Sequence, residues 1–411
     1  MPSLIVCPAS LVLNWAEECQ KFTPELSCVV VDGDAAHRAE LAESWPAADL
    51  VVTSYDLLRR DEALYEGQEF YACILDEAQA IKNHTTQKYK AVCKVRSRVR
   101  FALTGTPVEN RLGELWSIFS FLMPGYLPPY KSFCSRFEKP IVQEEDQTAV
   151  RRLNQLTGPF ILRRMKSDVL KELPPKTENV YRIELEEEQR KLYLAAVVDA
   201  REKLQTAKPE DKMAVFAVLM RLREICCDPR LIADNWTGGS AKLDACIELV
   251  TSAVESGHRI LLFSQFTSML ELLAKRLDAE GVSHFTLQGS TPKPVRAELV
   301  RRFNGGEASV FLISLRAGGT GLNLTAADIV IHYDPWWNVA AQNQATDRAY
   351  RIGQQNPVQV YKLIAQDTIE EKIVELQQAK QDLAETVTGS ADGAILRMKP
   401  EELLNLLEGT E

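Results

Sequence analysis

The 411-residue sequence predicts an α/β fold with two lobes, each built on a parallel sheet, and a helical insert between them. Short β-rich runs alternate with helical patterns in two separate stretches, about residues 1–125 and 240–385. Most of these runs are continuously apolar, which is typical of parallel strands covered on both faces. Between the stretches the pattern changes, and residues 130–235 are rich in charged helix formers. These three observations together indicate the two-lobed architecture.

The expected elements follow from these runs. The strands expected in the first stretch are Leu4–Cys7, Cys28–Val31, Leu50–Thr53, Cys73–Leu75 and Arg100–Leu103. Those expected in the second are Arg259–Phe263, His284–Leu287, Val310–Ile313, Ile329–Tyr333 and Val358–Lys362. Helical patterns cover Ile183–Val197 and Lys212–Glu224, and a last helix should run from a capping box at Thr368 and Glu371 to Val387. The expected domains are residues 1–127, an insert with linker over 128–239, a second lobe over 240–388 and a helical tail over 389–411.

Composition excludes several classes of protein. Hydrophobic residues make up 45% and charged residues 26%, which is an ordinary globular balance. The apolar runs are too short to span a bilayer, and no basic segment precedes the first run as in a signal peptide. The nine cysteines include no CxxC pair, which favours a reducing compartment, and the adjacent Cys226 and Cys227 are expected to pack in a core. The net charge of −9 argues mildly against nucleic acid, so any DNA contact must come from a local groove.

Two acids follow a strand in the first stretch. In CILDEAQAIKN, the apolar run Cys73–Leu75 delivers Asp76 and Glu77 at its carboxyl end, where open α/β sheets bind ligands. Such a pair suits a magnesium nucleotide site, in which one acid holds the metal and the other orients water. A solvated acid pair at a helix start is the alternative.

The next expected strand ends in Thr104-Gly105-Thr106-Pro107, in the stretch FALTGTPVEN. Its hydroxyls and glycine could sense the neighbouring acids and a nucleotide. A tight turn with proline at the start of a helix explains the same residues without a ligand.

The second stretch supplies glycines and arginines. Gly318, Gly319 and Gly321 would let backbone approach a ligand closely. Arg348 and Arg351 are three apart, so on a helix they would share a face and could clamp a polyphosphate. A surface face of salt bridges is the alternative.

In this order the motifs resemble superfamily-two helicases, and within them the Swi/Snf-type DNA-dependent ATPases. The resemblance extends from Leu4 almost to the C-terminus. Its most specific pieces are LTGTPVEN, FILRRMKSDVLKELPPK, SLRAGGTGLNLTAADIVIHYDPWWN and DRAYRIGQ. It implies two RecA-like lobes that use ATP and Mg²⁺ to move along double-stranded DNA.

The resemblance also implies residue roles. Asp76 would hold magnesium, Glu77 would position water, and Arg348 and Arg351 would face the γ-phosphate. Gln344, Asp347 and Gly321 would contact the nucleotide. Coupling would pass through Gln79, Thr104, Gly105 and Thr106. The residues implied in DNA contact are Pro8, Ala9, Ser10, Thr53, Ser54, Gly289, Ser290, Thr291, Ser314, Gly318, Gly319, Thr320, Asn323, Trp336 and Trp337; core packing is the alternative for both tryptophans.

Two departures from the family's pattern affect these expectations. Gln79 stands where many relatives have histidine, and its amide can still donate and accept hydrogen bonds. The sequence also contains no GxxxxGK[ST] phosphate-binding loop. We therefore expect an N-terminal truncation, little ATPase activity in this chain alone, and an unpaired strand edge near Leu4–Cys7 and Cys73–Leu75.

The function implied is an ATP-driven translocase that displaces or remodels a DNA-bound protein of unknown identity. A non-catalytic binding remnant and a strand-separating helicase are the alternatives. We expect a cytoplasmic, nucleoid-associated protein in a bacterium or a nuclear one in a eukaryote.

Overall fold

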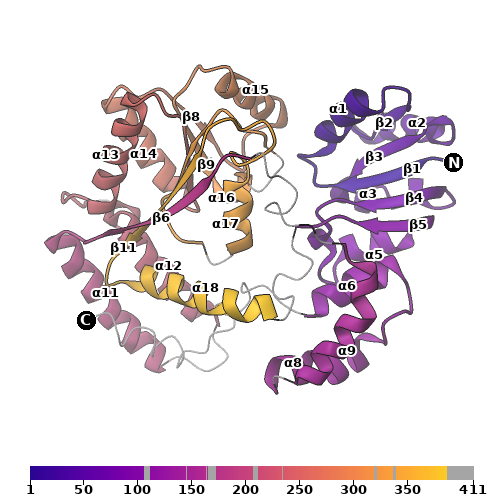
Figure 1. Ribbon diagram of the computed structural model, residues 1–411, viewed down its shortest axis with the longest axis horizontal. Coiled ribbons are helices and arrows are strands. Elements are labelled where there is room, and N and C mark those ends of the chain that lie inside the picture. Colours follow the sequence, from indigo (N-terminus) through magenta and orange to yellow (C-terminus); the bar gives the residue numbers. More distant parts are fainter. Residues whose placement is uncertain are drawn as a thin grey trace. The chain divides into compact units, whose positions relative to one another are not determined.

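The computed structural model describes residues 1–105, 112–144, 146–162, 164, 173–206, 212–233, 235–318, 322–336 and 339–386 (Figure 1). The chain divides into two compact units, essentially residues 1–163 and 164–382, which we call the first and second lobes. No helix in these described ranges is long and apolar enough to cross a membrane.

The first lobe is built on a five-stranded parallel sheet in the order β2-β3-β1-β4-β5. Its strands are β1 (Ser3–Cys7), β2 (Cys28–Val30), β3 (Leu50–Ser54), β4 (Glu69–Leu75) and β5 (Arg96–Ala102). Its α-helices are α1 (Val12–Phe22), α2 (Ala35–Ser44), α3 (Tyr55–Arg60), α4 (Glu62–Tyr65), α5 (Gln87–Lys94), α6 (Leu112–Leu122), α7 (Tyr130–Phe133), α8 (Lys139–Gln143) and α9 (Gln147–Thr157). Short helical turns are η1 (Trp45–Ala47), η2 (Ala78–Ile81), η3 (Cys134–Glu138) and η4 (Gly158–Phe160).

The second lobe is built on a six-stranded parallel sheet in the order β6-β11-β10-β7-β9-β8. Its strands are β6 (Lys176–Ile183), β7 (Ile260–Ser264), β8 (His284–Leu287), β9 (Val310–Ser314), β10 (Ile329–His332) and β11 (Val358–Ala365). Its helices are α11 (Glu187–Thr206), α12 (Lys212–Cys227), η5 (Pro229–Leu231), α13 (Ala241–Glu255), α14 (Thr267–Ala279), α15 (Lys293–Asn304), α16 (Leu315–Gly318), α17 (Val339–Thr346) and α18 (Ile369–Thr386).

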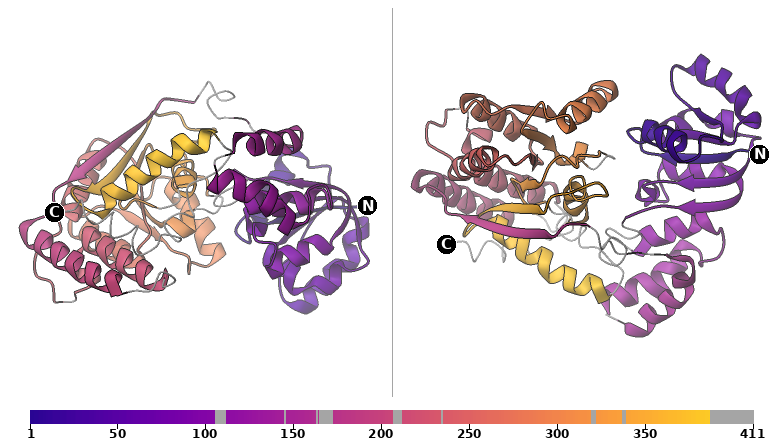
Figure 2. Two further views of the ribbon diagram at one scale, coloured as in Figure 1. Left: turned by 90° about the horizontal axis from the view of Figure 1, so that it is seen from below. Right: turned by 45° about the horizontal axis from the view of Figure 1, so that its top comes forward.

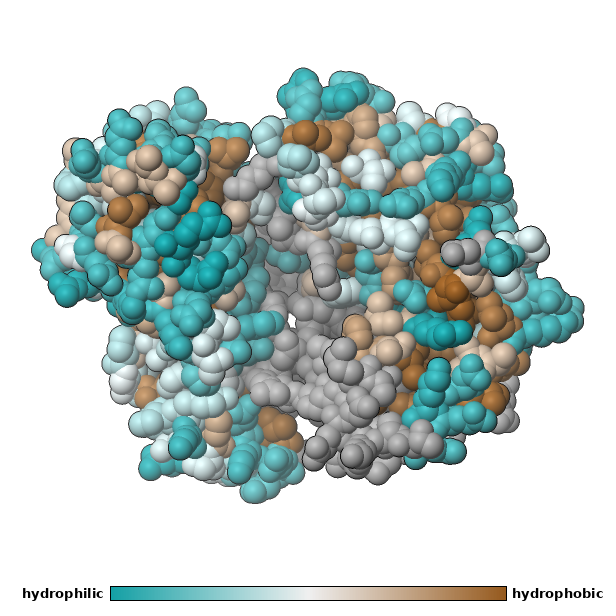
Figure 3. All heavy atoms as spheres, turned by 180° about the vertical axis from the view of Figure 1, so that it is seen from behind, coloured by the Kyte–Doolittle hydropathy of each residue, from teal (hydrophilic) through white to brown (hydrophobic). Residues whose placement is uncertain are grey.

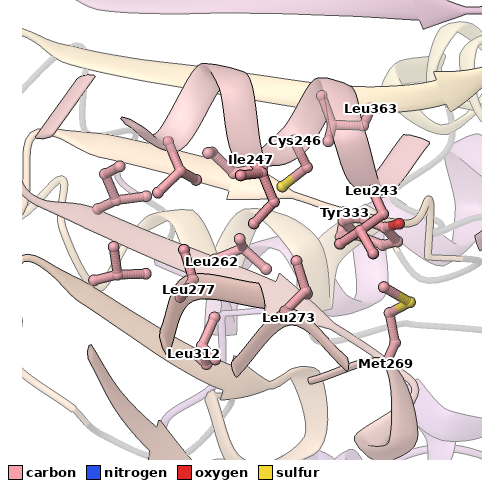
Figure 4. Close-up of a cluster of buried hydrophobic side chains, with 14 of the residues drawn as sticks. Leu243, Cys246, Ile247, Leu262, Met269, Leu273, Leu277, Leu312, Tyr333 and Leu363 are labelled. Atoms are coloured by element: carbon pink, nitrogen blue, oxygen red, sulfur yellow. The ribbon is translucent and has the colours of Figure 1, made fainter. Parts of the chain in front are cut away.

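Both sheets confirm the sequence pattern of continuous apolar runs, since each of the ten expected runs overlaps a strand. In the second lobe, successive residues of β7 face opposite cores. Leu262 packs with Leu243 of α13 and Leu273 of α14 (Figure 4), whereas Leu261 and Phe263 belong to the core on the other face. A strand buried on both sides needs apolar residues at every position, which is why these strands were visible in the sequence.

The eleventh strand, β6, was not expected. Its side chains are exposed except Ile183, because it is the edge strand beside β11 and has no continuous apolar run. Glu178 receives salt bridges at 2.7 Å from Lys176 and from Lys362 of β11. Burial alone would raise the pKa of Glu178, but these two lysines lower it to about 2. The edge pairing is therefore supported by charge rather than by an apolar face.

The expected insert is not a separate body in the structure. Helices α7 to α9 pack on α6 of the first lobe, through a core that includes Phe133, Phe137 and Leu153. Helices α11 and α12 lie side by side in the second lobe (Figure 2), and their shared core includes Ile369 and Ile373 of α18. The boundary between the two units falls at residues 163 and 164, within the expected insert over 128–239, and the expected tail at 389–411 lies outside the described residues.

The two strands at which an unpaired edge was expected are inner strands of the sheet. β1 pairs with both β3 and β4, and β4 pairs with both β1 and β5, so placing the edge at Leu4–Cys7 and Cys73–Leu75 was wrong. In the described first-lobe sheet the edge strands are β2 and β5. On β5, Val99 and Phe101 are exposed apolar residues, as is Leu103 beyond it, and Phe101 is 51% exposed. Figure 3 shows one face of the molecule, on which hydrophilic residues predominate and apolar patches lie between them.

A fully buried cluster of charges ties the second lobe together. Lys242 of α13 bonds Glu370 of α18 at 2.6 Å, and Arg223 of α12 lies 3.4 Å from Asp334, which follows β10. All four side chains are inaccessible to solvent. Burial raises the pKa of Asp334 despite Arg223, and Glu370 raises the pKa of Lys242 although burial opposes it. Removing one member of such a pair costs about 3–5 kcal/mol, because its partner is left buried and uncompensated.

We predict that residues 173–386 unfold cooperatively as an isolated fragment, whereas residues 241–386 are much less stable. The shorter fragment removes β6 from the edge of β11 and removes Arg223 from Asp334. Thermal unfolding and amide exchange of both fragments provide the measurement. Equal stability would show that β6, α11 and α12 are dispensable to this lobe.

A second prediction concerns His332 of β10, which is fully buried, stacks on Phe263 and bonds the Thr346 hydroxyl at 2.8 Å. Burial lowers its pKa to about 3. An unfolded histidine near pKa 6.5 gains a proton as pH falls while the folded one does not, so stability should fall by about 2 kcal/mol from pH 7 to pH 5. In His332→Gln this part of the pH dependence should disappear in urea unfolding of the second lobe. An unchanged pH dependence, or an imidazole titrating near pH 6.5 by NMR, would contradict the assignment.

Candidate functional site

The functional side chains of the first lobe follow strands that end at one edge of its sheet. β1, β3, β4 and β5 are parallel, so the segments after them emerge together. The Asp76 amide donates to the Val6 carbonyl at 2.8 Å, and the Leu103 amide donates to the Leu75 carbonyl at 2.7 Å. These bonds continue the pairing of β4 with β1 and β5 beyond the strand ends. They bring the segments after the three strands close together at the expected site.

Asp76 is held by three donors. Its carboxylate accepts hydrogen bonds at 2.9 Å from the Trp15 indole N–H and from the Glu77 amide. Its carbonyl oxygen accepts from the Tyr55 hydroxyl at 2.8 Å. Burial, aided by Asp76, raises the pKa of Tyr55 far above its ordinary value, so the phenol remains a donor. The carboxylate is thereby fixed in orientation at the end of β4.

Glu77 has a left-handed backbone, with φ 49° and ψ 53°, which is unusual for a residue other than glycine. The strain turns the chain directly from β4 into η2. The Gln79 amide nitrogen donates to the Glu77 carboxylate at 2.5 Å, and the Thr104 hydroxyl donates to the Gln79 amide oxygen at 2.8 Å. A strained backbone supported by surrounding bonds is common at catalytic sites. A hydrogen-bonded chain therefore joins Thr104 to Glu77 through Gln79.

The site fits a magnesium ion held mainly by its nucleotide. Each Asp76 carboxylate oxygen accepts one of the hydrogen bonds given above, and each retains acceptor capacity. Across the described residues, no group of three or more His, Cys, Asp or Glu side chains converges as an all-protein metal site. Magnesium usually takes only one or two carboxylates and completes its shell with water and phosphate. Asp76 meets that requirement.

The expected DNA contacts of the first lobe divide into two groups. Pro8, Ala9 and Ser10 are partly exposed in the turn after β1. Thr53 and Ser54 are buried, so the expectation that their side chains contact DNA is not supported. The Thr53 hydroxyl accepts a bond from Tyr65, and the Ser54 hydroxyl caps α3 by accepting from the Leu57 amide.

The expected DNA contacts of the second lobe are likewise mixed. Gly289, Ser290 and Asn323 are exposed, whereas Ser314 is buried at the end of β9. The Thr291 hydroxyl accepts a bond from the Gln288 amide at 3.1 Å, which closes the turn after β8. Gly318 ends α16. The expectations for Thr106, Gly319, Thr320, Gly321 and Trp337 lie outside the described residues, whereas Gly105 is described just after Thr104.

The two arginines do not share a helix face, contrary to expectation. α17 ends at Thr346, and the following residues form successive turns. Thr346 is held by His332, and the Gln354 amide bonds the carbonyls of Ala327 and Ala349, which folds the chain back. Arg348 is 7% exposed and Arg351 is exposed, so their environments differ.

The remaining predicted residues of this segment are partly buried. Gln344 belongs to α17, and Asp347 follows it. Trp336 packs against the core that contains Val330 and Ala345, and its carbonyl accepts a bond from the Gln377 side chain. The packing alternative for Trp336 therefore has direct structural support.

Sequence reasoning missed two residues that contact Asp76. Neither Trp15 nor Tyr55 was assigned a role from the sequence. The available signal was their position, since each helix starts close after a segment expected to contact DNA. Cys226 and Cys227, in contrast, are fully buried in two different cores, which confirms their expected role in packing.

Two RecA-like lobes, each built on a parallel sheet, with adjacent acids after an inner strand of the first, are typical of nucleotide-driven motor ATPases. Residues 1–231 match the model of the SNF2-related domain, and residues 241–353 match that of the helicase conserved C-terminal domain. The chain belongs to the SNF2-related family.

Relatives with curated descriptions come from bacteria and eukaryotes. A putative ATP-dependent helicase/translocase of Bacillus subtilis is 39% identical over 98% of this chain and 45% of its own length. An uncharacterized ATP-dependent helicase of Mycoplasma genitalium is 38% identical over 99% of this chain and 39% of its own length. A TATA-binding protein-associated factor of Saccharomyces cerevisiae is 34% identical over 99% of this chain and 25% of its own length. The chain thus spans less than half the length of these relatives.

A solved structure agrees with the family assignment. The Sulfolobus solfataricus SWI2/SNF2 ATPase core in complex with double-stranded DNA is 35% identical and has a TM-score of 0.50. The match covers 99% of this chain and 86% of that one. Similarity therefore extends across both lobes.

Proposed function

We propose that this chain forms the motor of an ATP-driven translocase that moves along double-stranded DNA. The observation that carries the proposal is the bonded chain Thr104–Gln79–Glu77 beside the oriented Asp76. Membership of the SNF2-related family and similarity to a DNA-bound ATPase core support it.

Each catalytic residue has a distinct task in this proposal. Asp76 holds the Mg²⁺ of a bound nucleotide, and the ion supplies positive charge to the phosphates. Glu77 orients the attacking water, and Gln79 fixes the Glu77 carboxylate while bonding Thr104. From the second lobe, Arg348 and Arg351 stabilise charge on the γ-phosphate, and Gln344, Asp347 and Gly321 contact the nucleotide. The amide of Gln79 suits its position because it donates to one neighbour and accepts from the other.

DNA contact is proposed at short exposed turns. Ser10, Gly289, Ser290 and Asn323 lie at such turns, after β1 and β8 and before β10. Small hydroxyl and backbone donors bind phosphates without reading base sequence, as a motor on mixed sequence requires. This arrangement is compatible with a net charge of −9, because it requires a local groove rather than a basic surface.

The work performed is proposed to be displacement or remodelling of a DNA-bound protein. The proposed motor would act where chromosomal DNA is found, which is the nucleoid of a bacterium or the nucleus of a eukaryote. The yeast relative is described as a TATA-binding protein-associated factor, which shows one setting in which a related motor occurs.

We predict that the 411-residue chain binds mixed-sequence duplex DNA with a strong dependence on salt. In the natural protein, ATPase should be stimulated by duplex DNA and abolished by Glu77→Gln, and a third strand should be displaced from a triplex without separation of the duplex. Failure to bind DNA would overturn the proposal. Strand separation would instead assign an unwinding helicase, and DNA binding without any turnover would assign a non-catalytic binding protein.

A further prediction separates nucleotide contacts from DNA contacts in the second lobe. Arg348→Ala and Arg351→Ala should each lower DNA-stimulated turnover, by about 10³-fold where one acts as an arginine finger, with little change in DNA affinity. Arg301→Ala is the matched control, because Arg301 lies on the surface of α15 and pairs with Glu298. Loss of DNA binding with intact ATPase would make the two arginines contacts to the DNA backbone.

A further inference from the structure

We propose that Trp15 is a positioning residue that couples DNA contact on the first lobe to the Asp76 carboxylate, while Tyr55 holds the Asp76 backbone in place. The inference rests on the proposed function and adds a route by which DNA regulates the site. Trp15 stands on the helix that follows the partly exposed turn after β1, whereas Tyr55 directly follows the buried end of β3, and both donate a hydrogen bond to Asp76.

Trp15 joins the turn after β1 to the carboxylate. The Leu11 amide donates to the Pro8 carbonyl at 2.8 Å, and the Trp15 amide donates to the Leu11 carbonyl at 2.9 Å, so the turn continues into α1 without a flexible joint. The ring packs against a core that includes Cys7 and Val12. Its N–H reaches the Asp76 carboxylate across 61 residues of sequence. A shift of the Pro8–Ser10 turn would therefore move the donor on that carboxylate.

Tyr55 makes a parallel connection from β3. It is the first residue of α3 and directly follows Ser54, whose hydroxyl caps that helix. The ring is 3% exposed in the core that contains Val6 and Leu75, and the hydroxyl bonds the Asp76 carbonyl. Tyr55 thus fixes the backbone of Asp76, whereas Trp15 fixes its carboxylate.

The chemistry of the two bonds gives them different effects. A donor to a carboxylate restricts rotation of the side chain and so holds its oxygens in the orientation that a metal would need, whereas a donor to the backbone carbonyl fixes the main chain. The partly exposed Trp15 could satisfy its N–H with water at little expense to the fold, so the bond to Asp76 is not required for burial. We assign the Trp15 bond as the adjustable contact and the Tyr55 bond as the fixed one.

The direct test follows the Trp15 indole N–H by NMR in the ¹⁵N-labelled 411-residue chain, with its signal assigned by Trp15→Phe. Asp76→Asn should shift this signal in the absence of DNA. A mixed-sequence duplex should shift it with the same concentration dependence as DNA binding measured by anisotropy. The Trp116 indole is the internal control, because it donates to the Pro128 carbonyl at 2.8 Å in the same lobe and should not respond.

The functional test uses the natural protein. Trp15→Phe and Tyr55→Phe each remove one hydrogen-bond donor; Tyr55→Phe keeps the ring, and Trp15→Phe keeps an aromatic but smaller one, as its control Trp116→Phe does. Trp15→Phe should raise the Mg²⁺ concentration for half-maximal turnover and lower stimulation by DNA, by about tenfold for loss of a bond to a charged group. Tyr55→Phe should have a smaller effect in the same direction. The matched controls are Trp116→Phe and Tyr89→Phe, which lose bonds to Pro128 and Ser120 and should behave as wild type.

The outcomes distinguish this inference from the proposed function. Absence of DNA binding would overturn both. DNA binding with an unchanged Trp15 signal, or DNA stimulation in Trp15→Phe equal to that of Trp116→Phe, would overturn the coupling and leave the motor assignment standing. Because the NMR test uses the wild-type chain, poor folding of a variant cannot explain a negative result.

Discussion

Parallel pairing in the first lobe is the constraint on which the candidate site depends. Since β1, β3, β4 and β5 run in the same direction, their carboxyl ends meet at one edge, and segments distant in sequence become neighbours. Residues after β1, β3 and β5 thereby come within bonding reach of the segment after β4, since Trp15 and Tyr55 bond Asp76 and Thr104 bonds Gln79. An antiparallel arrangement would place half of these segments at the opposite edge.

Strain at one residue gives the site its shape. The left-handed backbone of Glu77 turns the chain between β4 and η2. As a result, the side chains of Asp76 and Glu77 make contacts with different residues. Asp76 is oriented by Trp15 and the Glu77 amide, whereas Glu77 is held by Gln79. A conformation of this kind costs about 1–3 kcal/mol and persists only when neighbouring contacts require it. The bonded chain to Thr104 provides that support.

In the second lobe, helices from two distant parts of the sequence pack against one sheet. The buried pairs Lys242–Glu370 and Arg223–Asp334 join α12, α13 and α18 at the carboxyl end of β10. Such pairs are a weak source of net stability, yet they penalise any arrangement that leaves one charge unmatched. They therefore specify where these helices dock, close to the segment that leads through Trp336 into α17.

The sequence by itself determined the two parallel sheets, ten of the eleven strands, the family and the position of Asp76 and Glu77 after a strand. Most of these features leave a local signal, because a strand buried on both faces, such as β7 or β9, must be apolar throughout, and a site at a strand end lies next to that run. Only the tertiary structure decided that β6 completes the second sheet and that Thr53 and Ser54 are buried. It also decided that Arg348 and Arg351 lie beyond the end of α17. The bonds from Trp15 and Tyr55 to Asp76 are likewise visible only in the structure. Each of these depends on contacts between residues far apart in the chain, and the spacing of residues along one segment carries no information about which distant partner will bury or bond them.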